Sequence, residues 1–443
     1  MADRFNHTIS LKRRKFSLRL ELGYIHITDI RFGDASKVED GVLYVNAEEV
    51  EALVLRDERI TSVKVDMARP GESVRITPVK DVIEPRVKVE GPGGMFPGVI
   101  SPVDTVGSGK THVLKGAAVV TTGTIVGFQE GILDMSGVGA DYTPFSKTNN
   151  LVLVIIPRKG LGSHEHEHAV REAGLKTAVY LGELARELTP DSTEVFETLP
   201  LTEGVKQFPD LPRVGYVQML QSQGLLHDTY VYGVDAKRIL PTLMSPTEVM
   251  DGAIISGNCV SACDKNPTYV HQNNPIVHDL FARHGKDLNF AAMIITNENV
   301  YLADKIRSSD WTSNLCAFLS LDGVIISEEG FGNPDTDLMM NCRKITDKGI
   351  KTVVITDEYA GQDGASQSLA DAHESADALV TGGNANQVVT LPRMDKIIGS
   401  EEYVGIIAGG WDQNKHEDGT ITVEIQAITG ATSEVGFAHL SAR

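Results

Sequence analysis

A cysteine that directly follows an asparagine is the feature of this sequence best suited to chemistry. Residues 254–264 read Ile-Ile-Ser-Gly-Asn-Cys-Val-Ser-Ala-Cys-Asp, so Cys259 follows Asn258, and Gly257 precedes both. A thiol in that place can attack the carbonyl carbon of the preceding residue and convert the amide into a thioester. This N→S shift needs a backbone that can distort, and Gly257 supplies local freedom.

A thioester at this position would let the chain make its own electrophile. Removal of the Cys259 α-proton and elimination of sulfur leave dehydroalanine, which hydrolyses to a pyruvoyl group and ammonia. The upstream product leaves as a thioacid and hydrolyses to a carboxylate. The new ketone can form a Schiff base with a substrate amine. Two alternatives stay open: a buried cysteine in a Gly/Ser/Ala-rich turn, and a redox or metal pair formed with Cys263.

Two other motifs match known sites only in part. Residues 106–111, Val-Gly-Ser-Gly-Lys-Thr, end like a phosphate-binding P-loop, but Asp104 occupies the place of its first glycine. We interpret them as a glycine-rich β connection. Residues 164–168, His-Glu-His-Glu-His, satisfy the H-E-x-x-H pattern of zinc proteases. They stand at the start of a predicted helix without an identifiable third ligand, so we expect no metal.

Composition limits the kinds of partner. The 443 residues include 41 Lys and Arg against 60 Asp and Glu, a formal charge of −19 that would repel nucleic acid. No apolar run has the length of a membrane span, so we expect no membrane association. The N-terminal segment is too polar for a signal peptide, and four cysteines form no disulfide framework. We therefore predict a cytoplasmic protein, with Cys316 and Cys342 as buried thiols.

The pattern of apolar residues predicts an α/β fold. We expect a mostly β domain at 1–145, an α/β region at 146–258 that ends at the predicted cleavage site, and a C-terminal α/β domain at 259–443 that carries the pyruvoyl terminus. Alternating strands and helices indicate βαβ units with a parallel, Rossmann-like sheet, whose carboxyl edge usually binds ligands. We predict helices at 166–187, 304–319, 335–348 and 366–375, and strands at 151–156, 214–220, 291–296, 323–327, 351–356 and 378–381.

Several long strings carry a more specific signal than any short motif. They include 223–237 (Gln-Gly-Leu-Leu-His-Asp-Thr-Tyr-Val-Tyr-Gly-Val-Asp-Ala-Lys), 246–265 around Asn258 and Cys259, 271–275 (His-Gln-Asn-Asn-Pro), 68–73 (Ala-Arg-Pro-Gly-Glu-Ser), 331–337 (Phe-Gly-Asn-Pro-Asp-Thr-Asp) and 356–361 (Thr-Asp-Glu-Tyr-Ala-Gly). Over nearly its whole length the chain resembles the substrate-specific proprotein of component B of the glycine/sarcosine/betaine reductases.

The resemblance implies a cut between Asn258 and Cys259 and a pyruvoyl cofactor derived from Cys259. It implies an oxidoreductase that removes ammonia reductively from glycine through a Schiff base, with a selenolate displacing the nitrogen. The implied partners are the selenocysteine-containing subunit of component B, selenoprotein A and the acyl-transferring component C, which together yield acetyl phosphate. Sarcosine and betaine are the alternative substrates. We favour glycine, because a quaternary amine such as betaine cannot form a Schiff base.

Other site residues are candidates by proximity in sequence. His227, Asp228, His271 and Asn273 flank the cleavage segment and suit proton transfer or amine binding, or else structural hydrogen bonds. Arg238 or Lys265 would suit a substrate carboxylate. Two further functions stay open: a self-processing hydrolase with Cys259 as N-terminal nucleophile, and a scaffold subunit that is never cut.

Overall fold

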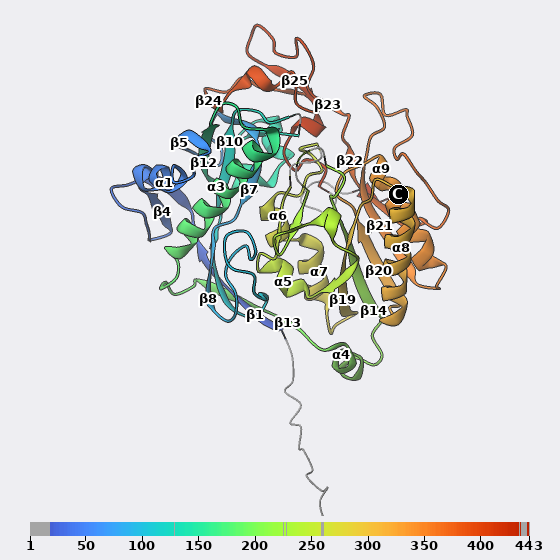
Figure 1. The fold of residues 1–443 in the computed structure, drawn as a ribbon. Helices are drawn as coiled ribbons and strands as arrows, with labels where there is room; N and C mark the ends of the chain where they lie inside the picture. Colours follow the sequence, from blue (N-terminus) through green and yellow to red (C-terminus); the bar gives the residue numbers. More distant parts are fainter. Residues whose placement is uncertain are drawn as a thin grey trace, which may run out of the picture.

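The computed structural model describes residues 18–127, 129–224, 226, 228–257, 261–433, 435 and 441–442. The predicted scissile pair Asn258 and Cys259 lies outside the described residues, as does His227. The described chain is a mixed α/β fold, as predicted, with a β-rich half beside a half built on one large sheet (Figure 1).

The β-rich half is built from small sheets that share a core. One sheet has the order β13-β1-β9-β8, a second β5-β12-β10-β7 and a third β11-β6-β24. Their strands are β1 (Leu18–His26), β5 (Ile60–Ala68), β6 (Val74–Val79), β7 (Asp81–Ile83), β8 (Arg86–Glu90), β9 (Gly109–Lys115), β10 (Ala117–Gly123), β11 (Gly131–Asp134), β12 (Asn149–Pro157), β13 (Ser192–Thr198) and β24 (Lys396–Gly399).

A long helix, α3 (Ser163–Glu183), packs against this half (Figure 1). It buries an apolar stripe that includes Ala169, Val170 and Leu181. At Gly182 a Cβ would stand 2.1 Å from the carbonyl oxygen of Arg86, so only glycine allows this contact. The His-Glu-His-Glu-His motif lies in the first turns of α3, as predicted. The P-loop-like segment leads into strand β9, which confirms its β interpretation.

The second half contains a seven-stranded sheet of order β17-β19-β14-β20-β21-β22-β26. The five central strands are parallel and the two edge strands antiparallel, which confirms the predicted parallel sheet. The strands are β14 (Arg213–Leu220), β17 (Thr242–Met244), β19 (Asn289–Asn297), β20 (Gly323–Ser327), β21 (Lys351–Glu358), β22 (Leu379–Asn384) and β26 (Ser441–Ala442).

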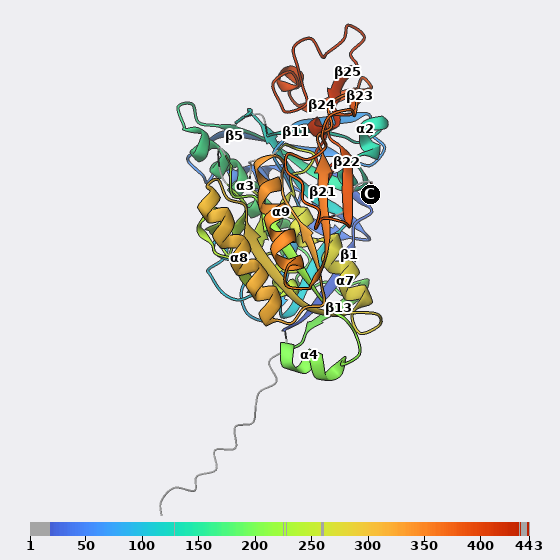
Figure 2. The same ribbon diagram turned by 90° about the vertical axis from the view of Figure 1, so that its right-hand side faces the viewer.

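Helices cover both faces of this sheet. Helices α8 (Leu302–Phe318) and α9 (Asn333–Thr346) lie over one face (Figure 2), and α7 (Pro275–Arg283) packs on β19 from the other (Figure 1). Cys316 on α8 and Cys342 on α9 are both buried, as predicted. No helix in the described ranges is long and apolar enough to cross a membrane.

The helix predicted at 366–375 is wrong. The structure has turns and bends there, because the backbone is bound by distant polar groups. Ala370 N donates to Asp335 Oδ2 at 2.5 Å, and Tyr359 N donates to the carbonyl oxygen of Ser368 at 2.9 Å. These tertiary hydrogen bonds replace the local ones that a helix would need.

Sheet pairing crosses every boundary of the predicted domain division. Strand β12, which follows residue 145, lies between β5 and β10 of the first half. Strand β14 precedes residue 258, yet it lies between β19 and β20, which follow that residue. Strand β24 lies late in the chain but pairs with β6, which belongs to the predicted N-terminal domain. The division at 145 and 258 therefore stays a prediction about the chain and does not describe separate sheets.

The remaining elements are short. They are β2 (Asp29–Phe32), β3 (Lys37–Glu39), β4 (Val42–Val45), α1 (Ala47–Val54), α2 (Val138–Asp141), α4 (Leu201–Gln207), β15 (Tyr230–Val231), β16 (Val234–Asp235), α5 (Pro246–Met250), β18 (Ile254–Ile255), α6 (Thr268–Gln272), β23 (Val388–Leu391) and β25 (Ile421–Glu424).

Candidate functional site

The segment that leads into the predicted scissile bond is buried and anchored. Strand β18 pairs with β15, and Ser256 N then donates to Thr268 Oγ1 at 3.1 Å. The Thr268 hydroxyl donates in turn to Asp81 Oδ2 at 2.7 Å, in the β-rich half. Gly257 packs against the main chain of Asp228, where no Cβ would fit. The upstream arm is thus fixed up to the residue before Asn258.

The segment that follows the scissile position is anchored by different parts of the fold. The hydroxyls of Ser261 and Tyr359 lie 2.7 Å apart, and Tyr359 directly follows β21. Gly430 N donates to the carbonyl oxygen of Ala262 at 2.7 Å, and Thr432 N donates to that of Cys263 at 3.1 Å. The downstream arm is therefore held by the large sheet and by the C-terminal segment.

Acidic side chains gather at the carboxyl edge of the large sheet, where the sequence predicts ligand binding. Burial raises the pKa values of Glu298 and Glu328 well above normal, and neighbouring carboxyls add to the shift. Glu328 Oε1 accepts a hydrogen bond from Thr356 at 2.5 Å. The buried carboxyls of this edge are Asp264, Glu298, Glu328, Glu329, Asp335, Asp337, Asp357 and Glu358.

His271 is one of the predicted catalytic residues, and it belongs to this edge. It is fully buried on α6, with Nε2 3.0 Å from Glu329 Oε1. Burial alone would raise the pKa of Glu329, but the charge and hydrogen bond of His271 outweigh it and the pKa is lowered. Thr229 Oγ1 also donates to Glu329 Oε2 at 2.8 Å. His271 and Glu329 are thus a buried, closely contacting pair of side chains at the carboxyl edge.

The other candidates occupy varied surroundings. Burial raises the pKa of Asp228 to about 6, although Lys237 Nζ lies 2.5 Å from its carboxylate. Asn273 accepts a hydrogen bond from Arg86 at 3.0 Å and donates one to Glu84 Oε2 at 3.0 Å, which is a structural role. Arg238 is exposed on the surface.

Lys265 is buried, and its Nζ donates to the carbonyl oxygen of Lys80. This contact joins the downstream arm to the β-rich half. A role in binding a substrate carboxylate stays a prediction for both Lys265 and Arg238.

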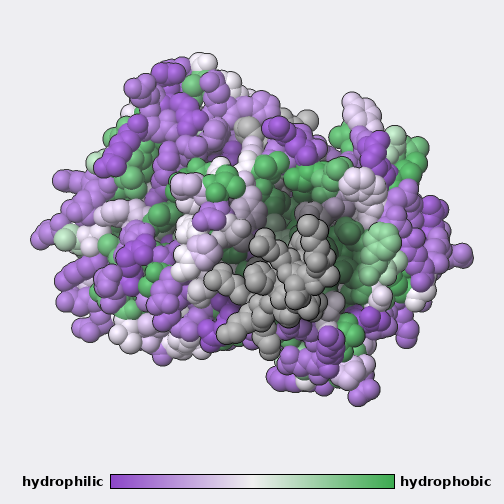
Figure 3. Space-filling view, turned by 60° about the horizontal axis from the view of Figure 1, so that its bottom comes forward, coloured by the Kyte–Doolittle hydropathy of each residue, from purple (hydrophilic) through white to green (hydrophobic). Residues whose placement is uncertain are grey.

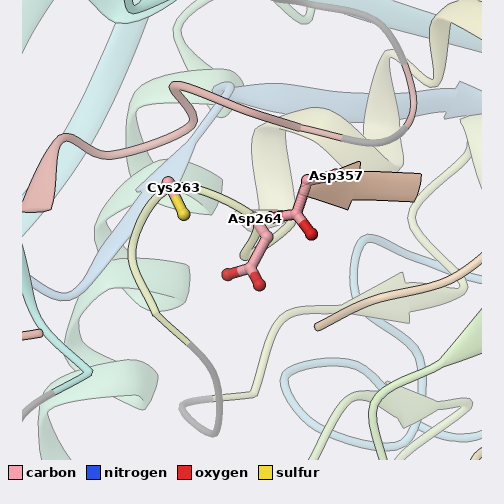
Figure 4. Close-up of side chains that lie close together, drawn as sticks. All are labelled: Cys263, Asp264 and Asp357. Atoms are coloured by element: carbon pink, nitrogen blue, oxygen red, sulfur yellow. The ribbon is translucent and has the colours of Figure 1, made fainter. Parts of the chain in front are cut away.

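Sequence reasoning placed Asp357 at the carboxyl end of a strand but did not predict that Asp264 and Asp357 lie beside Cys263. Figure 4 shows both carboxylates close to the Cys263 thiol, with Asp357 at the end of β21. One donor atom from each residue lies within 4.8 Å of the other two. The position of Asp357 at a strand's carboxyl end was the available signal, but no pattern linked it to Cys263.

One cavity of the described chain lies away from these groups. It measures about 660 Å³ and opens between β13 and α7, with Phe196, Phe281 and His278 in its lining. Figure 3 shows the molecule with the lower side of Figure 1 turned forward, where apolar residues gather around a hollow. None of the buried carboxyls of the sheet edge lines this cavity.

Comparison with known proteins identifies the class and then the family. A family described as glycine/sarcosine/betaine reductase component B subunits matches residues 18–443. The chain is thus an oxidoreductase component with an α/β fold. It belongs to the family of glycine/sarcosine/betaine reductase component B subunits, as the resemblance in the sequence predicts.

Three relatives show the range of similarity. The glycine reductase complex component B subunits alpha and beta of Acetoanaerobium sticklandii are 68% identical, covering 96% of this chain and 100% of the relative. The sarcosine reductase complex component B subunit alpha of Peptoclostridium acidaminophilum is 58% identical over the same shares. The D-proline reductase proprotein PrdA of A. sticklandii is 22% identical over 75% of this chain and 54% of its own length. No solved structure matches.

Proposed function

We propose that the chain is the self-processing precursor of the pyruvoyl-containing subunits of a selenium-dependent amino-acid reductase, cut between Asn258 and Cys259. The observation that carries the proposal is the anchoring of both arms around this bond. Thr268 and Asp228 hold the upstream arm, whereas Tyr359 and the C-terminal segment hold the downstream arm.

Anchoring on both sides favours an intramolecular reaction. Fixed ends limit the conformations that the residues between them can adopt, so less entropy is lost on reaching the geometry of attack. Gly257 stands at the end of the upstream arm, and its backbone tolerates conformations that other residues avoid. The same anchors would keep the newly formed terminus in place after the cut.

The names of two relatives agree with a cut chain. The A. sticklandii glycine reductase relative aligns over its full length and is named as two subunits, alpha and beta. The D-proline reductase relative is named a proprotein. Both names describe a polypeptide that gives rise to more than one product, which supports the proposed processing.

The carboxyl edge of the large sheet suits an amine substrate. A pyruvoyl group at position 259 would supply a ketone carbonyl that reacts with the substrate amine. The buried carboxyls nearby favour a cation over an anion. His271 with Glu329, and Asp228 with its pKa of about 6, are groups able to hold or transfer a proton near neutral pH.

Similarity to known proteins supports the proposed substrate and partners. Greater identity to the glycine reductase relative than to the sarcosine reductase relative supports glycine as the substrate. The word "component" in both names implies other proteins in the complex. The proposed ones are the selenocysteine-containing subunit of component B, selenoprotein A and component C, acting in the cytoplasm.

Intact-mass analysis of the protein from its native host tests the proposal. We expect two fragments that meet at residues 258 and 259, with the downstream one lacking the Cys259 sulfur and gaining mass on borohydride reduction. Cys259→Ser should leave the chain uncut or slow the cut severely. Cys316→Ser, which removes a buried thiol on α8, should be cut as the wild type is.

Two results would overturn the proposal. A downstream fragment that keeps its sulfur and reacts with thiol reagents would favour a hydrolase with Cys259 as nucleophile. A single full-length band on a denaturing gel would favour an uncut scaffold subunit.

A further inference from the structure

A thiol and two carboxylates meet in the interior, just beyond the predicted scissile bond. Cys263 and Asp264 belong to the downstream arm, and Asp357 comes from the end of β21 (Figure 4). All three side chains are completely buried. Their nearest donor atoms lie within 4.8 Å of one another.

The oxygens of this cluster lack the partners that buried carboxylates normally have. Within the described ranges, Asp264 Oδ1 and Asp357 Oδ1 have no hydrogen-bond partner, nor has Glu328 Oε2 close by. Most buried polar atoms in proteins are paired, so three unpaired oxygens in one place need an explanation. The charges that act on Asp357 are those of other carboxyls, Asp264, Glu328 and Asp335.

We propose that Cys263 Sγ and one carboxylate oxygen each of Asp264 and Asp357 bind a divalent transition-metal ion such as Zn²⁺ or Fe²⁺. Ligand atoms lie about 2.0–2.3 Å from such ions, so two of them on one ion are at most about 4.6 Å apart. The three ligand atoms now lie within 4.8 Å of one another, so they would need to move only slightly closer to bind one ion. A thiolate ligand disfavours Mg²⁺ and Ca²⁺, which prefer oxygen ligands alone.

The surroundings suit a bound ion. The ion would supply positive charge among buried carboxylates whose oxygens are not all hydrogen-bonded within the described part of the chain, a situation that is otherwise costly. Tyr359 Oη lies 3.5 Å from Cys263 Sγ and donates to Asp264 Oδ2 at 3.4 Å, and Thr432 Oγ1 donates to Asp357 Oδ2 at 3.1 Å. Such contacts orient the ligands of metal sites.

The ion would also tie two parts of the fold together. It would link the downstream arm directly to β21 and hold the residues after the scissile position. This assignment replaces the sequence-based expectation of no metal, which considered the histidine motif of α3. It does not depend on cleavage, because all three ligands lie on the same side of residue 258.

Cobalt binding tests the site in a chain carrying Cys259→Ser, which has no thiol at 259 and which we expect to be uncut or cut only slowly. After chelator treatment, titration with Co²⁺ should give one ion per chain and the near-ultraviolet absorption of a thiolate–cobalt bond. Adding Cys263→Ser should abolish that band, and Cys316→Ser should keep it. Loss of a residue that only orients a ligand costs about 10–100-fold in metal affinity, so Asp357→Asn should weaken cobalt binding at least about 100-fold.

Metal content of the wild-type complex gives a second measurement that needs no variant to fold. One equivalent of zinc or iron per chain supports the site. No bound metal together with no cobalt band overturns it, and so does a band that survives Cys263→Ser. Fragment masses from the same wild-type sample report on cleavage separately, so failure of the metal site and failure of the proposed processing are distinguishable.

Discussion

Gly257 and Asp228 touch through their main chains. A Cβ placed on Gly257 would stand 2.1 Å from both the carbonyl carbon and the carbonyl oxygen of Asp228, far inside van der Waals contact. Gly257, the residue before the predicted scissile pair, therefore packs in direct contact with the backbone of Asp228. A glycine at this position is a requirement of packing as well as of backbone freedom.

Replacing this glycine should damage both stability and processing. We expect Gly257→Ala to destabilise the chain by about 2 kcal/mol or more, because neither main chain can move without cost. The fraction of chains that are cut between residues 258 and 259 should fall as well. Gly204→Ala is the control, since its Cβ would meet only Asn289 at 3.6 Å. Urea unfolding and denaturing gels measure the two effects, and equal behaviour of both variants would refute the packing argument.

The His271–Glu329 pair should show strong coupling. His271→Gln removes the imidazole that lies 3.0 Å from Glu329 Oε1, and leaving a buried polar group without its partner costs about 1–3 kcal/mol. Adding Glu329→Gln removes the stranded charge, so the double variant should be more stable than the sum of the single losses predicts. A double-mutant cycle by urea unfolding measures the coupling. Additive losses would show that the two side chains do not interact.

Arg86 should contribute strongly to stability, because it joins strand β8 to helices α5 and α6. It is completely buried, pairs with Glu84 at 2.5 Å and donates to the carbonyl oxygens of Met250 and Gln272 at 2.5 and 3.1 Å. Arg86→Met strands Glu84 and these carbonyls, so we expect a loss of about 3–5 kcal/mol.

The control for Arg86 is an exposed pair. Arg283→Met removes a contact with Asp287 in which the two side chains are 63% and 51% exposed, so stability should stay close to that of the parent chain. Chemical unfolding of both variants tests the difference. Similar losses in the two would contradict the role assigned to Arg86.

His166 should make stability fall in mild acid. Burial, with the charge of Lys80, lowers its pKa from 6.5 to about 4, so the folded chain holds the ring neutral while the unfolded chain protonates it. Its contribution is therefore complete above pH 6.5 and is lost as the pH falls toward 4. After discounting for the solvent-exposed part of the ring, we expect about 1–2 kcal/mol.

Unfolding of His166→Gln and of the parent chain between pH 7.5 and 4.5 measures this contribution. The variant should lose less stability than the parent over that range. His164→Gln, an exposed residue of the same motif, controls for removing any histidine from α3. An identical pH dependence in His166→Gln and the parent would contradict the assignment.

The sequence predicted local structure well and long-range contacts poorly. Apolar runs identified β14, β19, β20 and β21, because a strand buried on both faces has a continuous apolar pattern. The helix predicted at 366–375 failed because Asp335 binds the backbone there. His271 was named as a candidate only because it lies near the cleavage segment in the sequence, and its contact with Glu329 was not predicted. The clusters around Cys263 and Gly257 join residues far apart in the chain, and periodicity carries no such information.

The order of strands in the large sheet has a consequence for the two products. Strand β14 precedes residue 258 but pairs on both sides with strands that follow it. A cut at residue 258 would therefore leave the two products joined within one sheet. The two products would form in equal amounts and stay bound to each other. They could exchange with products of another molecule only if the chain unfolded. Halves expressed as separate genes would each lack the neighbours that their strands require, and we expect them to be insoluble apart.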